Sequence, residues 1–177
     1  MPSSLSLILS ILPTFCLFLC SADKFRELLI ALFHFDFKSE HRINKALCEL
    51  LVHFVSVNAL HLPNALELFV NRFRSIRATL SSDNPSQIDK GFLDTIHETI
   101  RRLCILTPTA PTLLLSILYK EFPHKRLDPA TITDYVAQVL RLLEARPELL
   151  SRGLDMITER CLDMDVDIII TMPSVMA

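Results

Sequence analysis

Prolines divide this chain into apolar segments that carry the periodicity of α-helices. The clearest segment spans residues 130–145, where apolar residues recur at spacings of three and four and charged residues occupy the other side. Its apolar positions are Ile132, Tyr135, Val136, Val139, Leu140 and Leu143. Asp128 and Pro129 precede it as an N-cap and a first-turn proline. The pattern predicts an amphipathic helix with one buried face.

The layout of helix, proline and helix recurs along the chain. We predict helices over 43–57 and 64–80, over 88–105 and 112–121, and over 130–145 and 148–164. The prolines between the members of each pair, Pro63, Pro108 and Pro147, lie 45 and 39 residues apart. Repeats of roughly 40 to 47 residues built from two or three helices are typical of HEAT and armadillo proteins. The predicted fold is therefore an all-α, HEAT/armadillo-like solenoid of stacked antiparallel helical hairpins.

The predicted solenoid occupies residues 23–167, between an apolar N-terminal segment at 1–22 and a frayed tail at 168–177. The apolar run Leu5–Cys20 is too short to span a bilayer, which takes roughly 20 residues. Residues Cys20-Ser21-Ala22 are typical of a signal-peptidase site, but no basic residue precedes the run. The segment is thus a first helix, a leader or a secretion signal.

Apolar stripes also predict the core and the state of the cysteines. The expected core residues are Leu103, Leu115, Leu118, Tyr135, Val139, Leu143, Leu154, Ile157 and Cys161. The five cysteines are an odd number without a C-x-x-C pair, so we expect mostly buried thiols rather than disulfides or zinc ligands. Gly153 is expected where a neighbouring backbone approaches the helix.

The chain lacks the motifs of common catalytic and cofactor sites. Two glycines in all cannot build a phosphate-binding loop or a nucleophile elbow. His34 and His53 have no suitably spaced partner for a metal. The run Asp163-x-Asp165-x-Asp167 begins like a calcium loop but has an isoleucine where the glycine is needed. We therefore expect neither an enzyme nor a metal or cofactor, and interpret the aspartates as a solvated end.

Clusters of cations are the remaining candidate site. The net charge of −2 gives no general attraction to nucleic acid or anionic membranes, so binding would need a local patch. The candidate partner-binding residues are Lys120, Lys125 and Arg126 around one helix end, and Arg72, Arg74 and Arg77 along another helix. The helix dipole favours cations near a helix C-terminus, which is an alternative explanation for part of the first cluster. Acidic residues gather between Asp155 and Asp167, and such separated charges suit partner orientation.

Two stretches of the sequence resemble a known family. Residues 103–126 read LCILTPTAPTLLLSILYKEFPHKR, a helix, a P-x-x-P turn, a second apolar helix and Phe-Pro before basic residues. Further on, Asp134-Tyr135-Val136, Pro147-Glu148-Leu149 and the run MITERCLDMDVD at 156–167 keep the order and nearly the spacing of the family's motifs. These features resemble the RNA polymerase I-specific transcription initiation factor family, the TIF-IA-like proteins.

The resemblance implies a function that composition and spacing do not. It implies a HEAT-repeat scaffold without catalytic activity that binds RNA polymerase I at its stalk and connects it to the promoter-bound core factor. Such a protein would be nuclear, and specifically nucleolar. Family members continue well beyond the position of Asp167, so we expect this chain to be a fragment. Gln138 stands where the family usually has asparagine, and the family's phosphorylated serines cannot be aligned here. The alternative is a secreted or membrane-associated helical protein.

Overall fold

In the computed structural model, residues 41–80 and 87–171 are described, and every regular element within them is a helix. The elements are α3 (His41–Val57), the 3₁₀ helix η2 (Ala59–His61), α4 (Leu62–Leu80), α5 (Gln87–Leu106), α6 (Ala110–Lys120), α7 (Pro129–Glu144) and α8 (Pro147–Thr171). The predicted all-α class is confirmed for these ranges. The expected N-terminal segment at 1–22, together with His34, lies outside them.

Each predicted helix is present, with bounds that differ by a few residues. The largest difference is at α8, which continues past Met164 to Thr171. Residues 168–171, the start of the expected tail, are therefore helical, and 172–177 lie outside the described residues. Pro129 occupies the first turn of α7 as expected, and Asp128 is its N-cap, although its side chain makes no capping hydrogen bond. At η2, Asn58 caps the helix by accepting a hydrogen bond from the Leu60 backbone at 3.1 Å.

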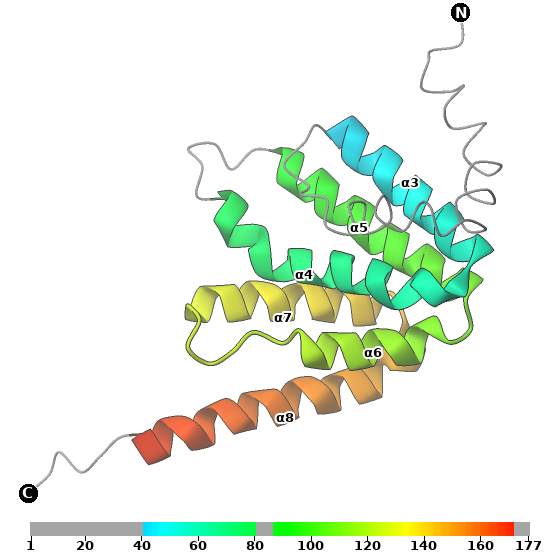
Figure 1. The fold of residues 1–177 in the computed structure, drawn as a ribbon. Coiled ribbons are helices and arrows are strands. Elements are labelled where there is room, and N and C mark those ends of the chain that lie inside the picture. The colour runs from blue at the N-terminus through cyan, green and yellow to red at the C-terminus, as the bar shows by residue number, and fades with distance from the viewer. Residues whose placement is uncertain (1–40, 81–86, 172–177) are drawn as a thin grey trace, which may run out of the picture.

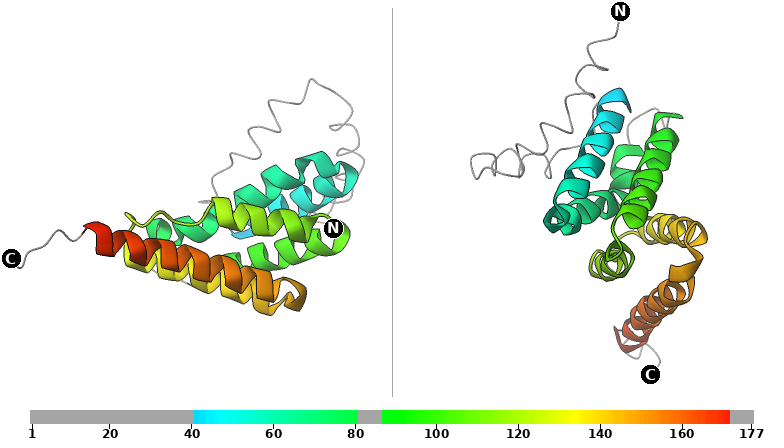
Figure 2. Two further views of the ribbon diagram at one scale, coloured as in Figure 1. Left: turned by 90° about the horizontal axis from the view of Figure 1, so that it is seen from below. Right: turned by 90° about the vertical axis from the view of Figure 1, so that its right-hand side faces the viewer.

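The helices form successive tiers in the order of the chain (Figures 1 and 2). One tier holds α3, α4 and α5, the next holds α6 and α7, and α8 lies at the far side from α3. The most extensive contact joins α3 to α5, while α4 packs on both α6 and α7. The last two helices form the predicted antiparallel hairpin, with α8 lying along α7 (Figure 2). None of the helices described is long and apolar enough to cross a membrane.

One hydrophobic core runs through all the tiers, with α4 at its centre. Its largest fully buried side chains include Phe54 of α3, Phe69 and Phe73 of α4, and Tyr135 of α7. The Phe73 ring stacks on His97 of α5 at 5.2 Å between centroids and meets the edge of Tyr135 at 6.4 Å. These rings tie three helices together, because aromatic side chains bury large apolar areas. The core predictions confirmed by burial are Leu103, Leu115, Leu118, Tyr135, Val139, Leu143 and Ile157.

The predicted buried face of α8 was wrong at two positions. Leu154 is 41% exposed and Cys161 is exposed, whereas Leu149 and Met156 are buried against α6 and α7. Two apolar stripes run along α8. Because α8 lies at the edge of the described structure, its neighbours α6 and α7 cover only one of these stripes. Gly153 lies on the covered stripe, but it faces the side chain of Leu143 rather than a backbone. Cys48 and Cys104 are buried, as expected for structural thiols.

Candidate partner-binding site

The cations expected to bind a partner lie on α4, at the end of α6 and in the loop 121–128. Both helices belong to one packed unit, since α4 contacts α6 directly. Arg74, Lys120, Lys125 and Arg126 are exposed, Arg72 is half-buried, and the side chain of Arg77 lies outside the described residues.

Buried aromatic contacts fix the loop that carries Lys125 and Arg126. The Tyr135 hydroxyl donates a hydrogen bond to the backbone carbonyl of Leu118 at 2.8 Å. The ring of Phe122 meets the ring of Tyr135 edge-on, with centroids 5.4 Å apart. Burial raises the pKa of Tyr135 well above its usual range, so the hydroxyl remains a donor even in alkaline solution. The start of the loop is thereby anchored to α7.

Lys120 and Arg74 pair with glutamates across the contact between α4 and the end of α6. Lys120 Nζ lies 2.7 Å from Glu67 Oε1, and the hydrogen bond to Glu67 raises the pKa of Lys120. Arg74 Nη1 lies 3.2 Å from Glu121 Oε2. Sequence reasoning missed both glutamates, because each is distant from its partner along the chain. These two ion pairs link α4 to the end of α6, and they balance part of the charge of Lys120 and Arg74 within the molecule.

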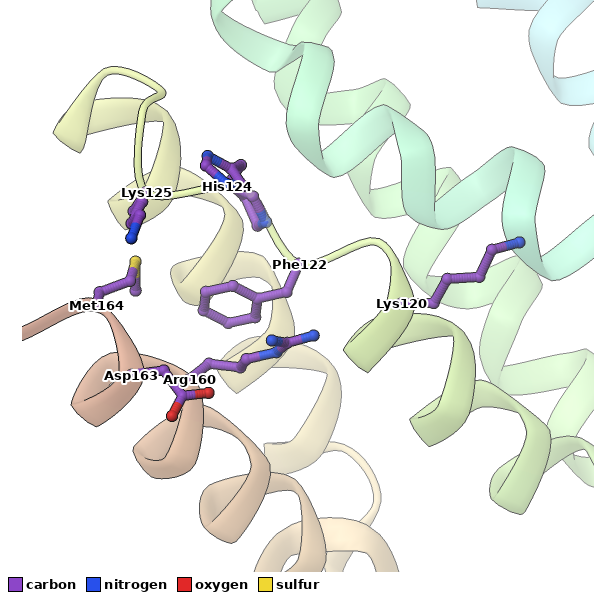
Figure 3. A pocket seen from close by; sticks show the side chains of 8 residues that line it. Lys120, Phe122, His124, Lys125, Arg160, Asp163 and Met164 are labelled. Carbon is purple, nitrogen blue, oxygen red and sulfur yellow. The ribbon is translucent and has the colours of Figure 1, made fainter. Parts of the chain in front are cut away.

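A groove of about 570 Å³ lies between the loop 121–128 and α8. It is lined by Lys120, Phe122, Pro123, His124, Lys125, Arg160, Asp163 and Met164. Figure 3 shows Lys125 beside Met164 on one side, Phe122 above Arg160 in the middle, and Lys120 directed away on the other side. The groove therefore combines cations, one carboxylate and an apolar floor.

Arg160 is the residue of this groove that sequence reasoning missed. Its guanidinium carbon lies 3.8 Å from the centroid of the Tyr119 ring, and one Nη donates to the Tyr119 carbonyl at 3.2 Å. Its Nε is buried and has no hydrogen-bond partner in the described structure. A signal was present in the sequence, since Arg160 continues the buried stripe of Gly153, Met156 and Ile157 at helical spacing.

A smaller groove of about 220 Å³ lies between α5 and α7. His97 Nε2 lies 2.9 Å from Gln138 Oε1, so the residue that departs from the family pattern takes part in an interhelix contact. Burial lowers the pKa of His97 despite this contact. Nearby, Arg141 pairs with Asp94. These polar groups satisfy one another across α5 and α7, which is typical of a structural contact.

The described side chains do not assemble a metal site. Within 41–80 and 87–171 no three His, Cys, Asp or Glu residues are grouped to hold an ion. Asp163 is exposed, and the side chains of Asp165 and Asp167 are outside the described set. His53 is half-buried on α3. Packed helices with mixed charged and apolar surface grooves are features of helical interaction proteins.

The comparison with protein families identifies the family to which this helical chain belongs. The family model described as "RNA polymerase I specific transcription initiation factor RRN3" matches residues 2–175. The chain therefore belongs to this family of transcription initiation factors, in agreement with the resemblance of residues 103–126 and 134–167. The family is named for initiation of transcription by RNA polymerase I, which makes ribosomal RNA, and not for a catalytic activity.

One curated relative illustrates the range of the match. The mouse (Mus musculus) protein named "RNA polymerase I-specific transcription initiation factor RRN3" is 26% identical over 126 residues. The match covers 67% of this chain but 19% of the mouse protein, so the chain spans about a fifth of that relative's length. No solved structure matches the chain.

Proposed function

We propose that this chain is part of a scaffold that bridges RNA polymerase I, through its stalk, to the promoter-bound core factor. Its site of action would be the nucleus, and within it the nucleolus. The observation that carries the proposal is the family match over residues 2–175. The described helices support it, because a rigid helical body can hold two partners at a fixed separation without chemistry of its own.

The proposed architecture of this scaffold is a HEAT-like solenoid. In such a solenoid, alternate helices stack on one another from repeat to repeat. The contacts of α3 with α5, of α4 with α6 and of α6 with α8 support this arrangement. Helix α7 packs mainly on α4, however, so its position is irregular for a simple stack.

The partner surface is proposed to centre on Lys125 and Arg126, with Lys120, Arg72, Arg74 and Arg77 beside it. Both residues are exposed on a loop that Phe122 and Tyr135 hold in place. Exposed charges on a fixed loop can steer an acidic partner and cost little conformational order on binding. Glu67 and Glu121 balance part of the charge of Lys120 and Arg74.

The test is recovery of RNA polymerase I from nuclear extract on the tagged full chain at low salt. The variant is Lys125→Glu with Arg126→Glu, and Lys120 is left intact because its replacement would also break the pair with Glu67. The matched control is Lys45→Glu with Arg152→Glu, which makes the same change of charge at exposed positions on α3 and α8. We expect the loop variant alone to recover less polymerase, and the difference to shrink as salt is raised.

Equal recovery by the two variants would place the partner surface elsewhere. Failure of the unaltered chain to recover polymerase would contradict the bridging role for this chain. The alternative function, a secreted or membrane-associated helical protein, depends on residues 1–22, which lie outside the described structure. Localisation of the tagged gene product in nuclei rather than in the medium would separate the two proposals.

A further inference from the structure

We propose that the groove between the loop 121–128 and α8 binds a short acidic peptide segment of a protein partner. In this arrangement a carboxylate of the peptide meets Arg160, and an apolar side chain packs on Phe122 and Met164. The inference rests on the proposed function, because the groove would provide the chemistry by which the surface around Lys125 binds a partner.

The size and the lining of the groove allow a ligand to bind. A volume of about 570 Å³ lies within the range of roughly 300 to 1,000 Å³ that is common for ligand pockets. The ring of Phe122 packs edge-on against the buried ring of Tyr135, so its position is already fixed in the free protein. Met164, on the opposite wall, is half-buried and flexible enough to adapt to different apolar side chains.

Arg160 supplies the observation that points to an anion. Its guanidinium is stacked on Tyr119, and the Tyr119 carbonyl accepts from one Nη, but its Nε is buried without an acceptor. No carboxylate among the described residues forms an ion pair with it, although Asp163 lies one turn further along α8. The Nε is too buried to meet a ligand, but the guanidinium carries further N–H groups on its two Nη atoms, and the Tyr119 carbonyl accepts from one of these atoms. Because Arg160 lines the groove, a peptide carboxylate can accept from the remaining Nη groups.

Charges around the groove favour a short peptide over a nucleic acid. Lys125 adds a cation next to Met164, but Asp155, Glu159 and Asp163 follow one another at intervals of four along the exposed side of α8. A long polyanion would meet these carboxylates, whereas a short acidic segment can end at Arg160. Backbones of nucleic acids bind along continuous cationic stripes, and the described part of α8 has none.

The same geometry indicates how each charge should act on the ligand. Lys125 should attract an acidic segment, and Asp163 should repel it, since both line the groove. If Lys125 and Asp163 served only to hold α8 in place, their replacement would not change the affinity for an acidic peptide in opposite directions. Asp163 thus provides the variant that separates binding from folding.

The experiment measures binding of a fluorescein-labelled peptide of alternating glutamate and leucine to the full chain by fluorescence anisotropy. Lys125→Glu should weaken binding about three- to fivefold, and Asp163→Asn should strengthen it about two- to threefold, as for exposed charge pairs. Arg160→Gln should weaken it about tenfold or more, because a charge-assisted hydrogen bond is lost. The control Arg152→Gln, exposed on the same helix away from the groove, should leave binding unchanged.

Further probes decide between occupants. A peptide with glutamine in place of glutamate should lose binding, and one with serine in place of leucine should bind several-fold more weakly. Equal binding of labelled oligouridylate, or a weaker complex after Asp163→Asn, would overturn the proposal. These measurements do not involve RNA polymerase I. Peptide binding without polymerase recovery would therefore refute only the proposed function, and the reverse result would refute only the peptide groove.

Discussion

Helices α4 and α8 show how differently two amphipathic helices of one chain can be used. Helix α4 contacts α5, α6 and α7, and its buried residues are nearly continuous from Ala65 to Val70. Helix α8 contacts α6 and α7 along one stripe, and leaves Leu150, Leu154 and Leu162 exposed. Helix α8 is the longer of the two, with 25 residues against 19, but α4 contributes more residues to the described core.

The difference shows that the neighbours of a helix, and not its own periodicity, decide what it buries. An apolar stripe contributes to stability in proportion to the area removed from water. For α4, packed helices cover several sides, and for α8 they cover one. We expect substitutions in α4 to affect the global stability of the chain, and equivalent substitutions on the exposed stripe of α8 to affect it little.

The largest effect is expected from Phe73→Ala in α4. Phe73 is fully buried between His97 and Tyr135, so its removal leaves a cavity where three helices meet. Truncation of a buried phenylalanine costs about 3 to 5 kcal/mol in the free energy of unfolding. Urea titration followed by circular dichroism would measure the loss.

The control for this prediction is Leu154→Ala in α8. Surface substitutions usually change stability by less than about 0.5 kcal/mol, and Leu154 is 41% exposed. A loss as large as that of Phe73→Ala would mean that the exposed stripe of α8 is covered in solution. The contrast between the two helices would then be wrong.

The sequence was sufficient to predict the helices because proline and apolar spacing are local signals. Pro129 and the spacing from Ile132 to Leu143 located α7 almost to the residue. The buried face of α8 was not predictable in the same way. Leu149 and Leu150 are both apolar and adjacent, and only the position of α7 decides that Leu149 is the buried one.

The candidate site was predictable as a region but not in its details. The basic cluster after α6 indicated a surface, and the loop does expose Lys125 and Arg126. The pairing of Lys120 with Glu67 depends on the packing of α6 on α4, and such contacts between distant segments leave no local pattern. Arg160 was missed because an arginine on an amphipathic helix is typical of the solvated face.

The reactivity of the cysteines provides a second measure of the contrast. Cys161 is exposed on α8, whereas burial raises the pKa of Cys48 on α3 to about 11 and also raises the pKa of Cys104 on α5. Because the thiolate is the reacting form, we expect iodoacetamide to modify Cys161 at least about a hundredfold faster than Cys48 in the native chain. Peptide mapping by mass spectrometry would give the rates.

Urea provides the control for this labelling experiment. In the unfolded chain the cysteines should react at similar rates, because burial no longer separates them. Rapid modification of Cys48 under native conditions would show that the contact between α3 and α5 opens readily. The central core would then be no more protected than the surface of α8.

Tyr135→Phe should cost about 1 to 2 kcal/mol, because it removes a buried hydrogen bond and leaves the Leu118 carbonyl without this donor. The ring contacts with Phe73 and Phe122 remain possible. Thermal unfolding would measure the change. The control Tyr119→Phe, at an exposed ring that keeps its face for Arg160, should have a smaller effect.

The same residue predicts a dependence on alkaline pH. Burial raises the pKa of Tyr135 in the folded chain, whereas an unfolded tyrosine titrates near pH 10. The unfolded state thus loses its proton first, so the contribution of Tyr135 is complete below about pH 10 and declines as the pH rises further. The stability of the unaltered chain should fall more steeply above this pH than that of Tyr135→Phe. Parallel profiles would contradict the buried position of the hydroxyl.

The smallest loss among the substitutions of buried residues is expected from Gly153→Ala, where α8 meets α7. A β-carbon at Gly153 would lie 2.4 and 2.5 Å from the two δ-carbons of Leu143, which is fully buried. Overpacking costs about 1 to 3 kcal/mol, but alanine is better than glycine in a helix by about 1 kcal/mol. We expect a net loss of about 1 kcal/mol in the free energy of unfolding, measured in urea.

A double-mutant cycle with Leu143→Ala makes this prediction specific to one contact. Leu143→Ala alone should cost about 2 to 5 kcal/mol, since it removes a buried side chain from the α7–α8 hairpin. In that background the clash is gone, so Gly153→Ala should become neutral or stabilising, and the two changes should be clearly non-additive. Additive losses would mean that Gly153 does not pack on Leu143. The covered stripe of α8 would then be held by its other members, among them Leu149, Met156 and Ile157.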